Sequence, residues 1–254
     1  MLQLKIGSRR RGWFEQVDRR KSFLRFAGMA LAWSWTASSS IVLAQQPQGS
    51  PSEDAGVFSI VAGERRIGTE KFKITPIATG FEATGEIQFE MPGSPRTSET
   101  SFLRTDDSLR PTSYQRQQKL PKKGAIFVQF GSPESKLTSE TETGSDERIF
   151  YFPDRQLVVL DTNFFHHFAI LLRHYASSRR GLQRFNVFVP QEATPGMITL
   201  ELLGQETLTV GTTTRELNHY EAVTDQVKIG IWADSQGKIS RISIPQASLE
   251  VVRQ

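Results

Sequence analysis

The sequence predicts a mainly β protein, in which a meandering antiparallel sheet curls into a barrel or half-barrel and one amphipathic helix packs on it. Three observations predict this fold. Short segments with a two-residue apolar repeat recur from residue 56 onward, turn sequences separate them, and one stretch near the middle of the chain has helical periodicity. We therefore expect a single β-rich domain over residues 56–254.

The first 44 residues have the pattern of a signal peptide. A basic leader ends at Arg25, and an uncharged run of about 19 residues extends to Ala44, near the lower length for a membrane span. Val42 and Ala44 are the small residues that signal peptidase requires, so cleavage is expected before Gln45. The predicted location is periplasmic or secreted, and the alternative is a membrane anchor formed by an uncleaved signal.

Two export routes fit the leader. The stretch RRKSFLRF (19–26) resembles a twin-arginine signal in which Lys21 stands in place of the second arginine. The general secretory route is the alternative. Either route takes the protein out of the cytoplasm, and membrane contact is expected only through the signal segment.

Charge and composition exclude several kinds of protein. Removal of the signal takes eight of the 31 Lys and Arg and two of the 27 Asp and Glu, which leaves 23 basic and 25 acidic residues and changes the formal net charge from +4 to −2. A nucleic-acid partner is therefore not expected, since binding to phosphates needs a basic surface. The chain has no cysteine, which excludes disulfides, a lipid anchor on cysteine and thiol chemistry.

Residues 45–55 (QQPQGSPSEDA) predict a flexible linker, and strands follow it. The clearest strand is GFEATGEIQFE (80–90), where apolar or small residues alternate with polar ones, so that one face covers a core and the other meets water. Similar patterns predict further strands at 57–61, 70–74, 100–105, 112–118, 125–130, 135–141, 148–152 and 156–160, and then at 184–189, 197–203, 206–210, 215–223, 227–233, 238–244 and 248–252.

Residues 163–177 are predicted to form the helix. At 100° per residue the apolar side chains form one arc about 160° wide, which is typical of a core-facing helix. Six aromatic or aliphatic residues of this arc are candidates to line a ligand cavity, and a fully packed core is the alternative: Phe164, Phe165, Phe168, Leu171, Leu172 and Tyr175. His166 lies opposite the arc, and His167 and His174 lie on one flank, so these histidines are expected in solvent.

No catalytic residue, metal site or cofactor is predicted. His167 and His174 are two helical turns apart, about 10 Å, which is too far for one ion bound at about 2 Å from each nitrogen. A metal site would have to recruit His219 and a carboxylate. Ser235 and Lys238 match the Ser-x-x-Lys spacing of β-lactamases but belong to a turn between two strands. Trp232 alternates out of phase with the apolar residues of its strand, so it lies on the opposite face, where it packs in a second layer or contacts a ligand.

In the order of its elements the chain resembles an uncharacterised family of exported bacterial antiparallel-β domains. The resemblance is carried by the spaced glycines Gly63 and Gly68, by the helix after an aspartate in VVLDTNFFHHFAILLRHY (158–175), and by the closing hairpin WADSQGKISRISIP (232–245). A looser architectural likeness is to the LolA-type lipoprotein carriers, half-barrels whose apolar concave face is covered by helices. The resemblance implies a fold and an envelope location, not an activity.

Three hypotheses for function remain open. The first is a non-enzymatic envelope protein that binds a lipid-like or other apolar small molecule between the sheet and the helix. The second is a structural or assembly module that binds an envelope protein through a strand edge or an exposed patch. The third is a metal-dependent hydrolase that uses His166, His167, His174 or His219.

Overall fold

The computed structural model describes residues 52–91, 93–152, 156–179, 181–210 and 213–254. The predicted signal peptide (1–44) and most of the predicted linker lie outside these residues. Within them, 15 strands form one continuous sheet. The strands are β1 (Asp54–Ala62), β2 (Arg65–Ile77), β3 (Gly80–Phe89), β4 (Thr97–Thr105), β5 (Pro111–Leu120), β6 (Gly124–Gln129), β7 (Glu134–Thr141), β8 (Gly144–Tyr151), β9 (Leu157–Val159), β10 (Gln183–Val189), β11 (Thr194–Val210), β12 (Thr213–Val223), β13 (Lys228–Ala233), β14 (Ile239–Ile244) and β15 (Leu249–Arg253).

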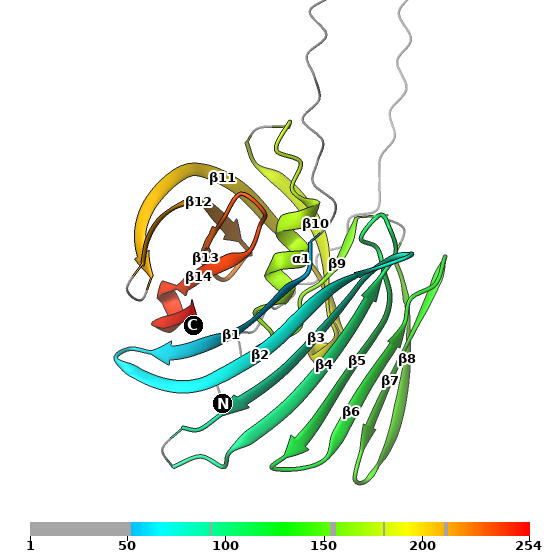
Figure 1. The fold of residues 1–254 in the computed structure, drawn as a ribbon. Helices are drawn as coiled ribbons and strands as arrows, with labels where there is room; N and C mark the ends of the chain where they lie inside the picture. The colour runs from blue at the N-terminus through cyan, green and yellow to red at the C-terminus, as the bar shows by residue number, and fades with distance from the viewer. Residues whose placement is uncertain (1–51, 92, 153–155, 180, 211–212) are drawn as a thin grey trace, which may run out of the picture. The chain divides into compact units, whose positions relative to one another are not determined.

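The strand order confirms the predicted curled meander. From one edge to the other it is β8-β7-β6-β5-β4-β3-β2-β1-β15-β14-β13-β12-β11-β10-β9 (Figure 1). Sequential neighbours pair throughout except for β8 and β9, which form the two edges of the sheet, and the first and last strands of the domain pair with each other, with Ile60 opposite Val251. The segments predicted at 197–203 and 206–210 form one strand, β11, with a register shift between Leu202 and Gly204. The domain is mainly β and its sheet is curled, but no hydrogen bonds join the two edge strands, β8 and β9, into a closed barrel.

One pair of strands departs from the expected all-antiparallel pattern. β9 and β10 run parallel, with Val158 opposite Val187. A parallel pair cannot be joined by a hairpin and needs a crossover of a dozen or more residues. Here residues 160–182 supply that crossover, and the helix α1 lies inside it. The helix therefore interrupts the run of strands because the direction of β10 requires a connection of that length.

Helix α1 spans His167–His174 and is shorter than the predicted 163–177. Asn163 has a φ of 73°, in the left-handed region that a right-handed helix cannot include. At the other end Tyr175 is extended, and the side chain of Gln183 bonds both the N–H and the carbonyl of Ala176. Both ends are therefore determined by a turn and by a contact from β10, which helical periodicity does not report. No helix among the described residues is long and apolar enough to cross a bilayer.

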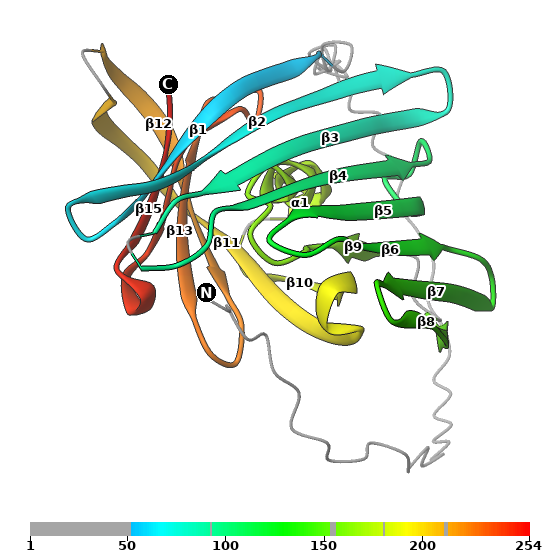
Figure 2. The same ribbon diagram turned by 90° about the horizontal axis from the view of Figure 1, so that it is seen from below.

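The expectation that the helix histidines lie in solvent is wrong for two of them. His166 and His167 are 0% exposed, and His174 is partly buried. The reason is the position of the helix inside the curl of the sheet (Figure 2), where strands lie on more than one side of it. Arg173 contacts the ring of Phe81 on β3, and His174 lies near β10. A helix in such a place has little wet surface, so its polar flank is buried as well as its apolar arc.

Aromatic side chains pack between the two edges of the sheet. Phe188 on β10 packs against Phe150 on β8, with ring centroids 4.9 Å apart, and against Phe152 at 5.0 Å. Phe130, after β6, contacts Phe188 edge to face at 6.2 Å. Such pairs contribute about 0.5–1.5 kcal/mol each beyond their burial. The curl is therefore held at this side by packing between rings, where β8 and β9 share no ladder of hydrogen bonds.

We predict that Gly85→Ala destabilises the fold by about 1–3 kcal/mol. A Cβ at Gly85 would lie 2.5 Å from Cε1 and 2.9 Å from Nδ1 of His166, so the buried imidazole would have to move. The matched control is Glu86→Ala on the next residue, whose side chain is exposed, with an expected change within about 0.5 kcal/mol. Urea unfolding of both variants measures the difference, and equal midpoints would contradict the tight contact.

Candidate functional site

A pocket of about 190 Å³ lies at one end of the concave face, where several strands begin or end. Its apolar wall is formed by side chains of β2, β3, β15, the β3–β4 connection and the crossover: Ile67, Phe89, Met91, Phe165 and Leu249. Its polar lining comes from β4, β5, the β3–β4 connection and the crossover: Ser94, Thr97, Glu99, Gln118 and Asn163. A few polar groups among apolar walls are typical of small-molecule sites.

Two local conformations shape the wall of the pocket. Gly68 lies opposite Phe89, and a Cβ there would lie 2.5 Å from the carbonyl of Gln88 and 2.8 Å from the Phe89 ring. The glycine thus leaves room for the ring beside β2. Asn163 adopts its left-handed conformation at the turn that brings Phe165 to the pocket. The spaced glycine and the asparagine turn therefore both position pocket residues.

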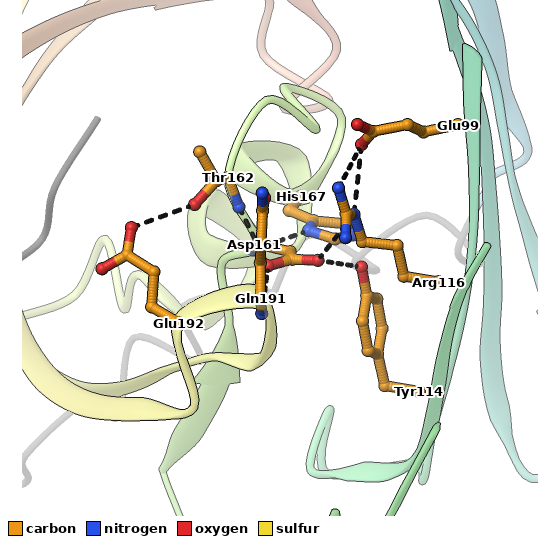
Figure 3. A network of polar contacts seen from close by, with 8 residues as sticks. All are labelled: Glu99, Tyr114, Arg116, Asp161, Thr162, His167, Gln191 and Glu192. Carbon is orange, nitrogen blue, oxygen red and sulfur yellow. Dashed lines mark hydrogen bonds and ion pairs between the residues drawn. The ribbon is translucent and has the colours of Figure 1, made fainter. Parts of the chain in front are cut away.

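Behind the pocket, a buried polar network centres on Asp161 (Figure 3). Oδ1 of Asp161 accepts hydrogen bonds from the backbone N–H of Thr162 (3.0 Å) and Gln191 (2.9 Å). The hydroxyl of Tyr114 donates to Oδ2 (2.5 Å), and the N–H of Asp161 donates to Nδ1 of His167 (3.2 Å). One carboxyl group therefore joins the crossover to β5 and to the 3₁₀ helix η1 (Pro190–Glu192).

Arg116 connects this network to the pocket. Its Nη2 and Nε lie 2.7 and 3.1 Å from Oε2 of Glu99, and Nε is 3.9 Å from Oδ2 of Asp161. Burial raises the pKa of Asp161 even though Arg116 and Tyr114 act against it. Burial also acts to lower the pKa of Arg116, but the two carboxylates outweigh it and raise the pKa above its ordinary value. Arg116 is therefore a fixed cation shared by two buried acidic groups.

A second buried pair supports the start of the helix. Oε2 of Glu70, on β2, accepts a hydrogen bond from the backbone N–H of Phe165 (3.0 Å), and Oε1 lies 2.5 Å from Nδ1 of His166. Burial raises the pKa of Glu70 to about 8 and lowers that of His166 to about 3. At neutral pH the carboxyl group is therefore protonated and donates to a neutral imidazole. Helix α1 has no capping side chain of its own. Glu70 from β2 instead accepts the hydrogen bond from the backbone just before the helix.

Glu70, His166 and Ser101 include the residue types of a Ser–His–Glu triad, but their geometry does not support catalysis. Glu70 and His166 are 0% exposed and Ser101 is 5% exposed. Nε2 of His166 and Oγ of Ser101 are buried, and neither has a hydrogen-bond partner among the described residues. A nucleophile must meet its base and its substrate; here Ser101 makes no hydrogen bond to His166, and both side chains are buried. The arrangement serves the fold.

The structure places the predicted ligand-lining residues in different surroundings. Phe165 lines the pocket. Phe164, Leu171, Leu172 and Tyr175 are buried in the main core cluster, and Phe168 is partly buried against it. These residues do not line that pocket, and whether any of them contacts a ligand stays a prediction.

Trp232 lies on the outer face of the sheet, as its alternation predicts. Its indole stacks on the imidazole of His219, with centroids 4.3 Å apart, and the guanidinium of Arg241 lies 4.9 Å from the ring centroid. Nε1 donates to Oε2 of Glu206 (2.8 Å), whose other oxygen bonds Nδ1 of His219 (2.7 Å). A Cβ at Gly230 would meet the indole at 2.7 Å. This group of side chains lies on the outer face of the sheet, and none of them lines the pocket.

No metal centre forms from the histidines that the sequence singled out. Among the described residues, no group of three or more His, Asp or Glu side chains converges as metal ligands. His166 and His167 lie close together, with ring centroids 4.4 Å apart, but their Nδ1 atoms face Glu70 and the backbone of Asp161 respectively.

Sequence reasoning missed the residues that form the polar interior: Glu70, Glu99, Tyr114, Arg116 and Asp161. One signal was present for three of them. Glu70 and Glu99 fall in phase with the inward residues of β2 and β4, and Arg116 is in phase with Tyr114 on β5. A charged side chain on the apolar phase of a strand indicates a buried partner.

Comparisons with known proteins show similarity of fold. No protein-family model matches the sequence, and no curated protein matches it. A solved β-barrel-like protein of the domain of unknown function DUF1849 from Brucella abortus matches with a TM-score of 0.51 and 9% identity, over 79% of this chain and 94% of that chain. A DUF1089 family protein from Pseudomonas aeruginosa has a TM-score of 0.45 and 8% identity, over 70% and 90% of the two chains. The first match is consistent with an uncharacterised, barrel-like β domain.

We predict that Arg116→Met costs about 3–5 kcal/mol of stability, because it leaves Glu99 and Asp161 without their buried cation. The matched control is Arg104→Met, which removes a half-exposed arginine paired with Glu82 on the outer face, with an expected cost below about 1 kcal/mol. Thermal or urea unfolding of the two variants gives the comparison. Equal losses would show that the Arg116 network does not hold the crossover.

Glu70 is predicted to make the protein less stable as the pH rises from 6.5 to 8. The unfolded carboxyl group is ionised above its ordinary pKa of 4.5, whereas the folded one keeps its proton to about pH 8. The folded state therefore binds one more proton, and its stability falls by about 2 kcal/mol over this window. Below pH 6.5 burial of neutral His166 opposes the effect of Glu70, and buried His167 makes stability fall on acidification.

Glu70→Gln isolates this effect. Glutamine can accept from Phe165 and donate to His166, as the protonated acid does, but it does not titrate. The difference between the unfolding free energies of the variant and the original protein should change by about 2 kcal/mol between pH 6.5 and 8. Parallel profiles across this window would contradict a protonated Glu70.

Proposed function

We propose that this protein is an exported, non-enzymatic binding module of the cell envelope that holds a small apolar ligand in the pocket beside Phe165. The observation that carries the proposal is the pocket itself, about 190 Å³ in volume and lined largely by apolar side chains. The basic leader and the uncharged run before Gln45 support export. The similarity to DUF1849 supports the fold only.

The volume of the pocket limits the size of the bound group. An apolar cavity of about 150 Å³ accommodates benzene, so 190 Å³ is sufficient for one ring or a short branched chain. A complete lipid needs more room, since ligand sites of drug size run to about 300–1,000 Å³. The proposed ligand is therefore a small lipid-like molecule, or one apolar group of a larger molecule whose remainder stays outside.

The sequence-based hypothesis expects the ligand between the sheet and the apolar arc of the helix, and the pocket lies at a different place. It lies between the sheet and residues 163–165 at the entry to α1, rather than along the arc of the helix. The aromatic arc packs into the core, which stabilises the wall behind the pocket. The ligand would accordingly be held by the strand ends and the crossover turn.

Thr97→Phe is predicted to abolish binding of toluene while the protein stays folded. Thr97 lines the pocket on the inner face of β4, so a phenyl ring there occupies the volume that a ligand would use. The matched control is Thr100→Phe, which adds the same ring to the outer face of the same strand. Chemical-shift titration with toluene measures both, and the original protein and Thr100→Phe should bind.

Two negative results together would contradict the proposal. If the well-folded original protein shows no saturable shifts with toluene or benzyl alcohol and copurifies with no small molecule by mass spectrometry, the pocket is not a binding site. The alternative is then the envelope interaction module, for which β8 offers the terminal strand of the sheet with Ile149 and Tyr151 exposed.

A further inference from the structure

We propose that the pocket selects ligands that carry a primary ammonium group on a small apolar body, and that Glu99 binds the ammonium. This inference rests on the proposed function and names the chemical class of its ligand. It is carried by the position of Glu99, which lines the pocket and is at the same time 2% exposed and tied to Arg116.

The two oxygens of Glu99 have different surroundings. Both contacts from Arg116, at 2.7 and 3.1 Å, go to Oε2. Within the part of the chain that the structure describes, Oε1 accepts no hydrogen bond, and it is not among the fully covered polar atoms that lack a partner. Since Glu99 lines the pocket and Oε2 is turned to Arg116, we assign Oε1 to the pocket side. A carboxylate oxygen in an apolar cavity strongly favours a hydrogen-bond donor, and a charged donor most of all.

The charges around Glu99 favour a cation over an anion. Glu99 and Asp161 are two acidic groups that share one guanidinium, that of Arg116. The residues that line the pocket include no Lys or Arg, and Glu99 is the ionisable side chain among them. His166 and His167 are buried with lowered pKa values and remain neutral near pH 7. A ligand ammonium would supply a second positive charge, whereas a ligand carboxylate would meet Oε1 as a like charge.

The polar groups beside Glu99 suit the remaining donors of an ammonium. A primary ammonium has three N–H donors, and Glu99 Oε1 accepts one. The side chains of Gln118 and Asn163 line the same pocket, and each offers an amide oxygen. The apolar wall from Ile67, Phe89 and Phe165 is left for the body of the ligand. A benzylamine-sized molecule satisfies both requirements at once.

The test is a series of four probes with the same ring: toluene, benzyl alcohol, benzylamine and benzoate. Each is titrated into the purified protein at pH 7 and followed by chemical-shift changes or calorimetry. Benzylamine should bind about tenfold tighter than benzyl alcohol, since a charge-assisted hydrogen bond is roughly twice as strong as a neutral one. Benzoate should bind at least about tenfold more weakly than benzyl alcohol, because of the like charge at Glu99.

Two substitutions with the same change of charge separate direct contact from a general field. Glu99→Gln keeps an oxygen for Arg116 and should lower the affinity for benzylamine about tenfold, to the level of the alcohol, with the alcohol changed by less than about threefold. Glu90→Gln is the control, because Glu90 is exposed next to the pocket residue Met91 and pairs with Arg96. It should leave the ratio of amine to alcohol unchanged.

The outcomes distinguish this inference from the function on which it rests. If none of the four probes binds, the proposed function fails. If toluene or the alcohol binds but the amine binds no tighter, the pocket is a ligand-binding site, but the proposed selectivity for an ammonium group is wrong. If Glu99→Gln does not fold, the order of affinities of the four probes for the original protein, together with the Glu90→Gln control, still decides the question.

Discussion

The parallel pairing of β9 and β10 is the constraint on which the interior of this protein depends. Because two parallel strands need a long crossover, residues 160–182 must pass through the concave side of the sheet. In the buried part of this crossover, which includes Asp161, Thr162 and Phe165, backbone N–H groups lie where water does not reach, and each needs a partner in the protein. Glu70, Asp161 and His167 meet that need for Phe165, Thr162 and Asp161 itself, and Asp161 also accepts from the N–H of Gln191 in η1. The buried charges are therefore consequences of the topology, and Arg116 and Tyr114 are present because Asp161 is.

The same crossover explains why a pocket remains at one end of the concave face. The crossover covers the middle of the face, where its phenylalanines and leucines pack with the inward residues of the strands. At the strand ends the chain turns at Asn163, and Asn163 and Phe165 line the pocket there. Glu99 lies where the two regions meet, with one oxygen on Arg116 in the polar interior and the other toward the pocket. The network that supports the fold thus also sets the chemistry at the floor of the proposed binding site.

The buried acidic residues Glu70, Glu99 and Asp161 have different hydrogen-bond donors. Glu70 faces a neutral imidazole and a backbone N–H, so burial dominates and the carboxyl group keeps its proton to about pH 8. Glu99 has a guanidinium at hydrogen-bond distance, and Asp161 adds a tyrosine hydroxyl and two backbone donors to the same cation. Nη2 of Arg116 contacts Glu99 as an ion pair but makes no hydrogen bond among the described residues, so the pairing of this buried cation is incomplete. The specificity inferred for the pocket depends on the arrangement around Glu99, where both contacts from Arg116 go to one carboxyl oxygen, Oε2.

The sequence by itself determined the strands, their turns and the existence of one helix between them. Alternation in GFEATGEIQFE and in the strand of Trp232 reports local geometry, because the two-residue repeat of a strand sets which face each side chain occupies. Only the tertiary structure decided the parallel register of β9 and β10, the ends of α1 and the burial of His166 and His167. These three features depend on tertiary contacts around the crossover. A helical wheel cannot report them, because it assumes that one face of the helix is exposed to solvent. The pocket was equally beyond the sequence, since Ile67, Glu99, Phe165 and Leu249 come from four segments that only the curl of the sheet brings together.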